Sequence, residues 1–253
     1  MPKTISIATD KLNIDTIINH FKDKFVFETK DIIAFYLLTE KDVKPPTINW
    51  RIYKMVQRGI LQRVGRGKFS LGESKNYIPE ISTKIKSVYI KVKKKFPYLN
   101  LCVWHTSVLN EFMLHQPNTF YYLVEVDKEA LNSVFYFLRE SEKSVFIEPT
   151  KDIFEKYVLN EKEVLIIKPL VSEAPLVLVN GINTASIEKL LVDIFCDDTL
   201  FSSQQGAEMR TIFGEALSKY TINWSKMLRY ADRRRKKACF SEFVNSIANL
   251  RQQ

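Results

Sequence analysis

Side chains that can read DNA bases and bind phosphates occur together between residues 47 and 68. The set consists of Thr47, Asn49, Trp50, Arg51, Lys54, Arg63, Arg66 and Lys68. Asn and Arg are the residue types that hydrogen-bond the edges of adenine and guanine, and Arg and Lys also bind phosphates. A helix over the first five residues would present them to the major groove, and a hairpin would present the last three to phosphates or the minor groove. Double-stranded DNA is therefore the expected ligand.

The elements that must position these side chains begin with three short helices. Apolar residues at helical spacing predict them over residues 12–21, 30–38 and 47–58. Asp10 and Thr29 stand where the first two helices need an N-terminal cap. Pro46 suits the first turn of the third helix, and Gly59 suits the position just after its end.

A β-hairpin is expected directly after the third helix. Four of the seven glycines fall between residues 59 and 72, and Gly65 and Gly67 bracket a turn between two short alternating strands. Three helices followed by a basic hairpin predict a winged helix-turn-helix. The glycine pair is no dinucleotide fingerprint, because Ser70 stands where a third glycine is needed. A dimerisation or docking module can have the same elements, with Trp50 in its core and a solvated cationic face.

The net charge of +9 is distributed unevenly along the chain. Residues 1–95 have a net charge of +11, residues 96–228 a net charge of −7, and the last 25 residues a net charge of +5. Clustered Lys and Arg side chains form the electrostatic footprint of nucleic-acid binding. The first segment is therefore the expected DNA-binding part, and the acidic middle segment is not expected to lie on DNA.

The length of 253 residues favours two globular units. A hydrophobic content of 45% and a charged content of 26% are those of a folded protein and exclude disorder and collagen. The chain has neither a membrane-length apolar run nor an apolar N-terminal core, so we expect no membrane partner and a cytoplasmic location. Cys102, Cys196 and Cys239 lack metal or disulfide spacing and are expected to be free, small buried residues.

The predicted fold class is α+β. The N-terminal winged helix-turn-helix (1–78) is followed by a basic linker helix (79–96) and a mixed α/β domain (97–253) that ends in a helical bundle. Buried strands are predicted over residues 101–106, 120–126, 145–147, 164–170 and 175–179. Asp127 and Ser186 would cap two further helices, and three apolar stripes after residue 208 predict the closing helices.

The residues after Phe96 give few signs of catalysis, and we predict no catalytic residue, metal or cofactor. No lysine there has an acidic residue two positions before it, as the common nuclease motif requires. Nucleotidyltransferase, P-loop and zincin motifs are absent, as are serine and cysteine nucleophile motifs. Among the three histidines, His105 and His115 are spaced poorly for a shared metal. Glu125 and Asp127 could hold a metal at a strand end, but a helix cap explains Asp127 better.

Three short segments stand out in the second half of the predicted architecture. They are WHTSVLN at 104–110 with LHQP at 114–117, SIEKLLVD at 186–193, and LRYA at 228–231. Together with an N-terminal winged helix, they resemble the AbiEi-like family of type IV antitoxins from abortive-infection systems. The second segment is similar to that family's PEKTLVDLL pattern, with Ile187 in place of the usual proline, and the third is similar to its LLxYAxR segment.

The resemblance implies a transcriptional autorepressor that binds inverted repeats in the operator upstream of its own operon. It also implies an antitoxin that opposes a co-encoded nucleotidyltransferase-like toxin, without necessarily forming a stable complex with it. A further basic segment would be a second DNA contact or a surface for cooperative self-association on DNA, and cations favoured at a helix C-terminus explain it equally well. Its arginines are Arg229, Arg233, Arg234 and Arg235.

Two other functions stay open from the sequence. One is a DNA-processing enzyme that the winged helix targets to its substrate, in which Glu111, Glu125 or Asp127 would be needed for activity. The other is a protein-interaction adaptor whose winged helix no longer binds DNA. A repressor would tolerate changes at the three acids and fail when the basic residues of the winged helix are removed, whereas an adaptor would ignore both sets.

Overall fold

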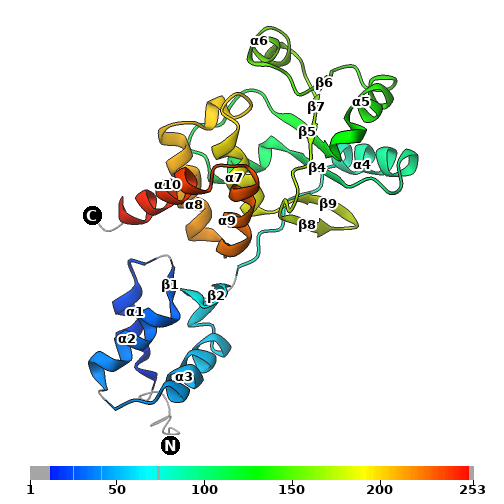
Figure 1. Ribbon diagram of the computed structural model, residues 1–253. Helices are drawn as coiled ribbons and strands as arrows, with labels where there is room; N and C mark the ends of the chain where they lie inside the picture. The colour runs from blue at the N-terminus through cyan, green and yellow to red at the C-terminus, as the bar shows by residue number, and fades with distance from the viewer. Residues whose placement is uncertain (1–11, 25, 41, 73–74, 251–253) are drawn as a thin grey trace, which may run out of the picture.

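The computed structural model describes residues 12–24, 26–40, 42–72 and 75–250, and their side chains as far as Ile247 (Figure 1). A smaller unit ends at residue 72, and a larger unit begins at residue 75. Helices and strands occur in both units, which confirms the predicted α+β class. The predicted cap Asp10 lies outside the described residues.

Three helices and a three-stranded antiparallel sheet form the smaller unit. Its elements are α1 (Ile14–Phe21), β1 (Phe27–Glu28), α2 (Thr29–Thr39), α3 (Pro45–Gln57), β2 (Leu61–Gly65) and β3 (Lys68–Leu71). The sheet has the order β1-β3-β2, so the strand between the first two helices pairs with the second strand of the hairpin. The three helices and the hairpin agree with the sequence prediction, which missed the two-residue strand β1.

Local signals explain where α2 and α3 begin and end. The backbone N–H of Glu28 donates to the Asp31 carboxylate at 2.7 Å, and the Glu28 side chain accepts from the backbone of Asp31, which forms a capping box. The prediction that Thr29 is the cap is therefore wrong, because Thr29 is already the first helical residue. Pro45 begins α3, and Gly59 follows its end at a φ of +69°, which glycine adopts without strain.

The larger unit is built on a four-stranded sheet of order β4-β5-β7-β6, in which β4 is antiparallel to β5 and the other three strands are parallel. A hairpin, β8-β9, lies beside β4. The strands are β4 (Leu101–His105), β5 (Tyr121–Val126), β6 (Val145–Ile147), β7 (Val164–Pro169), β8 (Leu176–Val179) and β9 (Ile182–Ala185). The five predicted strands are all present, and β9 was missed.

Seven α-helices are described in the larger unit. They are α4 (Thr83–Lys95), α5 (Leu131–Arg139), α6 (Lys151–Lys156), α7 (Ile187–Cys196), α8 (Ala207–Lys219), α9 (Trp224–Arg233) and α10 (Lys237–Leu250). Short 3-10 helices are η2 (Thr106–Phe112), η3 (Lys128–Ala130), η4 (Val158–Asn160) and η5 (Ser202–Gln204). None of the helices in the described part of the chain combines the length and apolar character needed to cross a membrane.

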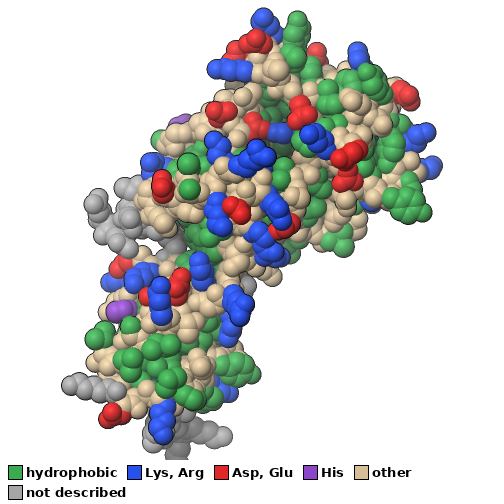
Figure 2. Space-filling model, viewed as in Figure 1, with side chains coloured by type: hydrophobic (Ala, Val, Ile, Leu, Met, Phe, Trp, Pro, Cys, Tyr) green, Lys and Arg blue, Asp and Glu red, His purple; other side chains and the backbone are tan. Residues whose placement is uncertain are grey.

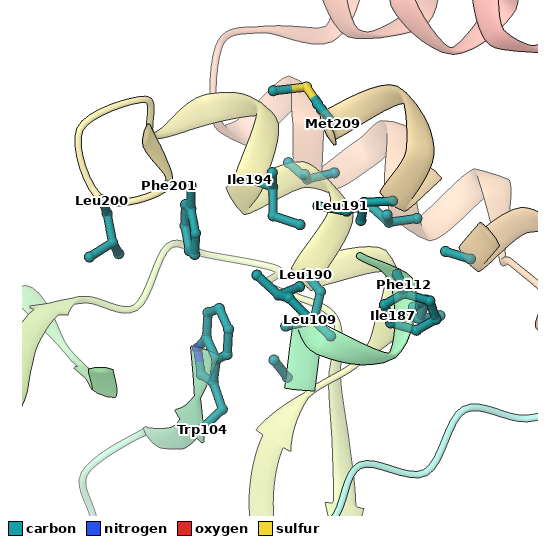
Figure 3. Close-up of a cluster of buried hydrophobic side chains, with 14 of the residues drawn as sticks. Trp104, Leu109, Phe112, Ile187, Leu190, Leu191, Ile194, Leu200, Phe201 and Met209 are labelled. Carbon is teal, nitrogen blue, oxygen red and sulfur yellow. The ribbon is translucent and has the colours of Figure 1, made fainter. Parts of the chain in front are cut away.

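Helices cover both faces of the four-stranded sheet (Figure 1). Side chains alternate between the faces, so that Val103 and Val124 pack with α4 and α5, whereas Trp104 and Leu123 pack with α7 to α10. Trp104 is fully buried and stacks on Phe201, with ring centroids 6.1 Å apart (Figure 3). Burial on both faces explains why the parallel strands have nearly continuous apolar sequences.

The helix α4 lies within the basic linker helix predicted for residues 79–96, and it packs on the sheet of the larger unit. Ile85, Val88 and Val92 are buried in the core beneath the sheet. The Ser82 hydroxyl caps the helix and accepts from the backbone N–H of Ile85 at 3.3 Å. The lysines of this helix stand on its other faces because its apolar stripe is used for packing.

Two cap predictions in the larger unit have different outcomes. Ser186 caps α7 as predicted, and its hydroxyl accepts from the backbone N–H of Lys189 at 3.4 Å. Asp127 makes no side-chain cap, because its carboxylate accepts from the backbone and side-chain amides of Asn100 at 2.8 and 2.9 Å. Of the cysteines, all free, one is buried as expected, while Cys196 is half-buried and Cys239 is exposed.

The hairpin of the smaller unit is docked on the larger unit. The Thr221 hydroxyl donates to the Gln62 side chain on β2 and accepts from the backbone N–H of Lys75 at 2.9 Å. A Cβ atom placed on Gly65 would lie 2.6 Å from the Ser225 hydroxyl oxygen, so the end of β2 is in close contact with α9. The hairpin is therefore held by α9 and does not project freely from the protein.

Thr221→Val is expected to loosen this junction, because valine has nearly the same shape but no hydroxyl. The Lys75 amide then loses its acceptor, and its hydrogen exchange should accelerate while the free energy of unfolding falls by about 1 kcal/mol. Hydrogen–deuterium exchange at Lys75 measures this effect. Thr211→Val is the control, since the Thr211 hydroxyl bonds to the Ala207 carbonyl within α8. Equal acceleration of hydrogen exchange at Lys75 in both variants would show that the Thr221 hydroxyl does not hold this junction.

Candidate nucleic-acid interface

The helix α3 turns one face to the core and the opposite face to solvent. Ile48, Ile52 and Met55 are buried in the smaller unit. Because the helix has 3.6 residues per turn, the opposite side is lined by seven residues that we call the α3 face. The α3 face consists of Pro46, Thr47, Asn49, Trp50, Tyr53, Lys54 and Gln57. Trp50 and Tyr53 are 50% and 52% exposed, although aromatic residues of this size are usually buried.

The α3 face is open and has no negative charge within the helix. α3 lies on the side of the smaller unit away from the larger unit (Figure 1), and its sequence contains no Asp or Glu. The Gln57 amide donates to the Tyr53 hydroxyl at 2.6 Å, and the Lys54 amine donates to the Gln57 side-chain oxygen at 3.2 Å. These exposed hydrogen bonds can be exchanged for bonds to a ligand at little cost.

Arg51 is buried, so the prediction that it reads a DNA base is wrong. It is 6% exposed, and its two terminal nitrogens donate to the two carboxylate oxygens of Glu40 at 2.9 and 2.8 Å. Its guanidinium lies over the Tyr36 ring, 4.6 Å from the centroid. Hydrogen bonds from Arg51 lower the pKa of Glu40. The pair joins α3 to the end of α2 and stabilises the smaller unit.

Arg51→Met is expected to lower the free energy of unfolding, because it removes the ion pair with Glu40. It should have no direct effect on ligand binding, because Arg51 is buried. The loss should be about 1 to 2 kcal/mol, the value of hydrogen bonds between charged groups discounted for the partial exposure of Glu40. Urea unfolding of the variant measures it. Arg58→Met, at the exposed end of α3, is the matched control and should change stability by less than about 0.5 kcal/mol. Equal stabilities for the two variants would contradict the buried position of Arg51.

The three basic residues predicted on the hairpin have different environments. Arg63 and Arg66 are exposed, and Lys68 is half-buried. The Arg63 guanidinium lies over the Phe69 ring, 5.3 Å from the centroid. Gly67 forms the turn at a φ of +66°, and its carbonyl accepts from the backbone N–H of Thr29 at 2.9 Å. Arg63 on β2 and Arg66 in the turn are therefore both exposed to solvent, where they can contact phosphates.

The later basic segment is divided between structural and exposed residues. Arg234 donates to the buried Asp193 at 2.9 Å, so it is not free to contact DNA, in contrast to the prediction. Arg229 and Arg233 both pair with Glu173. Arg235 is exposed at the end of α9. Figure 2 shows that Lys and Arg side chains gather where the two units meet, which includes the region of α9.

Comparison with known proteins places most of this chain in a family. Residues 47–250 match a family described as a family of unknown function, DUF6577. The chain belongs to the DUF6577 family. The part of the chain that matches begins within α3 and ends with α10, so it includes most of the α3 face, the hairpin and the larger unit as described. No curated protein matches the chain.

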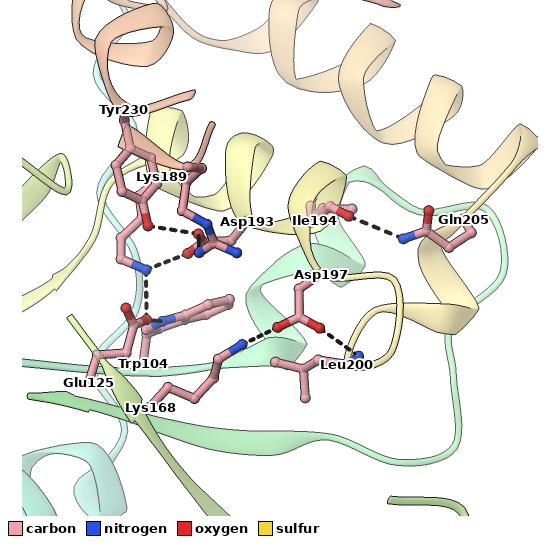
Figure 4. Close-up of polar contacts among 11 residues, drawn as sticks. Trp104, Glu125, Lys168, Lys189, Asp193, Ile194, Asp197, Leu200, Gln205 and Tyr230 are labelled. Atoms are coloured by element: carbon pink, nitrogen blue, oxygen red, sulfur yellow. Dashed lines mark hydrogen bonds and ion pairs between the residues drawn. The ribbon is translucent and has the colours of Figure 1, made fainter. Parts of the chain in front are cut away.

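The larger unit of this DUF6577 protein contains a buried network of charges that sequence reasoning missed (Figure 4). Lys189 on α7 is fully buried, and its amine lies 2.6 Å from the Glu125 carboxylate and also pairs with Asp193. The Trp104 indole N–H donates to Glu125 at 2.7 Å. Lys189 and Asp193 are four residues apart within an apolar helix sequence, and this spacing is the signal from which their pairing could have been predicted.

The second half of the network surrounds Asp193. The Tyr230 hydroxyl donates to Asp193 at 2.8 Å, and Arg234 donates to the same oxygen. Burial alone would lower the pKa of Lys189, but Asp193 and Glu125 raise it well above its ordinary value. Burial alone would raise the pKa of Asp193, but Lys189 and Arg234 hold the pKa of this carboxyl below its ordinary value. Lys189 and Asp193 are therefore both charged at neutral pH, while burial raises the pKa of the Tyr230 phenol and keeps it neutral.

Each of the three segments singled out in the sequence, 104–117, 186–193 and 228–231, contributes to this network in the DUF6577 chain. The first segment supplies Trp104, the second supplies Lys189 and Asp193, and the third supplies Tyr230. The segments therefore meet in space although they are far apart in sequence. Their shared role is to hold α7 and α9 on the sheet.

The residues considered for catalysis or metal binding do not form a complete site. His105 Nδ1 lies 2.6 Å from the Ser107 hydroxyl oxygen, and burial lowers the pKa of this histidine to about 4. A nucleophilic serine would also need an acidic group to orient the histidine, and no described residue provides it. His115 lies 3.4 Å from Glu208. Among the described residues, no three His, Cys, Asp or Glu side chains are close enough to hold a metal.

Proposed function

We propose that this protein is a sequence-specific DNA-binding transcriptional regulator whose smaller unit is a winged helix-turn-helix. The chain order α1-β1-α2-α3-β2-β3 and the sheet order β1-β3-β2 support this assignment. In this winged helix-turn-helix, α3 is the recognition helix that enters the major groove, and the β2-β3 hairpin is the wing. Thr47, Asn49, Trp50 and Lys54 remain the proposed base and backbone contacts on α3, and Arg63, Arg66 and Lys68 those on the wing.

The observation that carries the proposal is the α3 face. A solvated helix face normally consists of charged residues, whereas this one combines two exposed aromatic rings with two side-chain amides and a lysine. Amides match the hydrogen-bonding pattern of base edges, and apolar groups match thymine methyl groups. Exposed basic residues on the neighbouring hairpin supply phosphate contacts that fix orientation.

The finer part of the proposal is autorepression and an antitoxin role against a co-encoded nucleotidyltransferase-like toxin. Its support is the sequence resemblance, whose segments contribute to the buried network and therefore favour a shared fold of the larger unit. Co-expression with the neighbouring gene tests the antitoxin role independently of DNA binding. Relief of growth arrest by the full chain supports it, and growth arrest that persists contradicts it.

DNA binding is tested by fluorescence anisotropy of the full chain on its own upstream DNA and on a scrambled duplex, at several salt concentrations. Tight binding to the upstream duplex alone supports a repressor. No binding to either duplex contradicts the proposal and favours an adaptor whose exposed aromatic residues dock on a protein. Equal and strongly salt-dependent binding to both contradicts sequence specificity and favours a nonspecific DNA protein.

Arg66→Ala is expected to weaken binding to both duplexes by a similar factor, because a phosphate contact contains no sequence information. The slope of log Kd against log salt should fall by about one, as one fewer counterion is released. Arg139→Ala removes an exposed arginine from the larger unit and is the matched control. A salt slope that is unchanged by Arg66→Ala would remove this residue from the interface.

A further inference from the structure

We infer that the base pairs read by α3 are mainly A·T pairs. This inference rests on the proposed function and names the class of DNA that the same site would select. It follows from which side chains are exposed on the α3 face and from the burial of Arg51. Arg51 is the arginine that would otherwise bind guanine.

Arg51 is the only arginine within α3, and its fork of donors is already used. Both terminal nitrogens are bonded to Glu40, and the side chain is buried beside Tyr36. A bidentate contact from arginine to guanine is the commonest specific contact in the major groove. Arg51 could make that contact only by breaking both hydrogen bonds to Glu40 and leaving its buried position beside Tyr36. Within α3, no arginine is therefore free to bind guanine.

The side chains that remain on the α3 face match adenine and thymine. Asn49 and Gln57 have the amide groups that bond the N6 and N7 positions of adenine in the bidentate pattern. They are two helical turns apart, with Tyr53 between them on the same side. Trp50 and Tyr53 present apolar ring surface, which favours contact with the thymine methyl group.

The lysine of the α3 face and the two exposed arginines of the hairpin do not restore guanine selectivity. Lys54 is half-buried, its amine bonds to Gln57, and it lies 5.9 Å from the centre of the Tyr53 ring. A single amine lacks the fork with which arginine selects guanine. Arg63 and Arg66 lie on the hairpin, and arginines that enter a minor groove favour the narrow grooves of A·T tracts. Both DNA-facing elements therefore point to the same base composition.

Selection of the full chain against randomised duplexes tests the inference. We expect the enriched sequences to share a core in which A·T pairs occupy the positions protected by α3. An enriched core of G·C pairs would overturn the inference and leave the proposed function standing. Failure to bind or enrich any duplex would overturn the proposed function, and the inference with it.

Modified bases in the selected duplex then identify the groups that are read. Replacing a contacted adenine by 7-deazaadenine removes an acceptor, and the affinity should fall about 5- to 150-fold at that position. In Asn49→Ala this sensitivity should disappear at one adenine, whereas Asn132→Ala, at an exposed position on α5, should retain it. A strong loss with 7-deazaguanine and none with 7-deazaadenine would overturn the inference even if binding is specific.

Discussion

Lys189→Met is expected to lower the free energy of unfolding by about 3 to 5 kcal/mol, as for other buried ion pairs that lose one partner. Lys189 is fully buried and neutralises Glu125 and Asp193, both about 5% exposed. After the substitution, Asp193 keeps Tyr230 and Arg234, but Glu125 keeps only the Trp104 indole N–H among the partners described. The larger penalty therefore falls on Glu125. Urea unfolding measures the loss.

Two further variants separate this effect from a general loss of packing. Lys168→Met removes the lysine of a pair with Asp197 that is partly exposed, so its cost should be only about 1 kcal/mol. Lys189→Met combined with Glu125→Gln removes the unpaired charge and should recover much of the lost stability, even if the single variant does not fold. A double variant no better than Lys189→Met would show that buried charge is not the cause.

Lys189→Met should also change how the free energy of unfolding depends on pH. The pKa of Asp193 is lower in the folded protein than in the unfolded chain. The ionised carboxylate therefore stabilises the native protein at a pH above the unfolded-state pKa, and this stability is lost as the pH falls through the folded-state pKa. Without Lys189, Asp193 loses the main charge that lowers its folded pKa, so the variant loses less stability than the native protein as the pH falls. The difference in stability between the native and variant proteins should therefore be smaller below the ordinary Asp pKa of 3.8 than at pH 7. A difference that grows toward acid would contradict this assignment.

Elements with strong local signals could be predicted from the sequence. The third helix was predicted because Pro46 suits its first turn and Gly59 follows its end, and the hairpin because glycines bracket its turn. Ser186 marked the start of α7 because its hydroxyl bonds within three residues along the chain. These signals act within one or two helical turns. They need no knowledge of how distant segments pack.

The pairings between distant segments could not be predicted in the same way. Arg51 has the residue type of a base reader, and only the position of Glu40, across the turn before α3, shows that it is already paired. Glu125 and Lys189 are 64 residues apart and meet because a strand and a helix pack together. Asp127 was predicted as a cap, but the packing of β4 beside β5 brings Asn100 to its carboxylate.

The combined substitutions Asn49→Ala and Trp50→Ala should largely remove discrimination between operator and scrambled DNA. Loss of an amide that reads adenine costs about 1 to 3 kcal/mol, or about 5- to 150-fold in Kd, on the correct sequence only. A central exposed tryptophan adds about 2 kcal/mol when it anchors an interface. Binding to scrambled DNA, which depends on phosphate contacts, should change little, and the salt slope should stay constant.

Stability and a matched aromatic control decide whether this loss belongs to the interface. Trp50 is half-exposed, so the double variant should unfold within about 0.5 kcal/mol of the native protein. Tyr98→Ala removes an almost fully exposed aromatic residue from the larger unit and should leave both affinities unchanged. If the double variant binds both duplexes as the native protein does, α3 is not the recognition helix. If it loses affinity for both equally, α3 binds DNA without reading its sequence, because base contacts must distinguish the two duplexes.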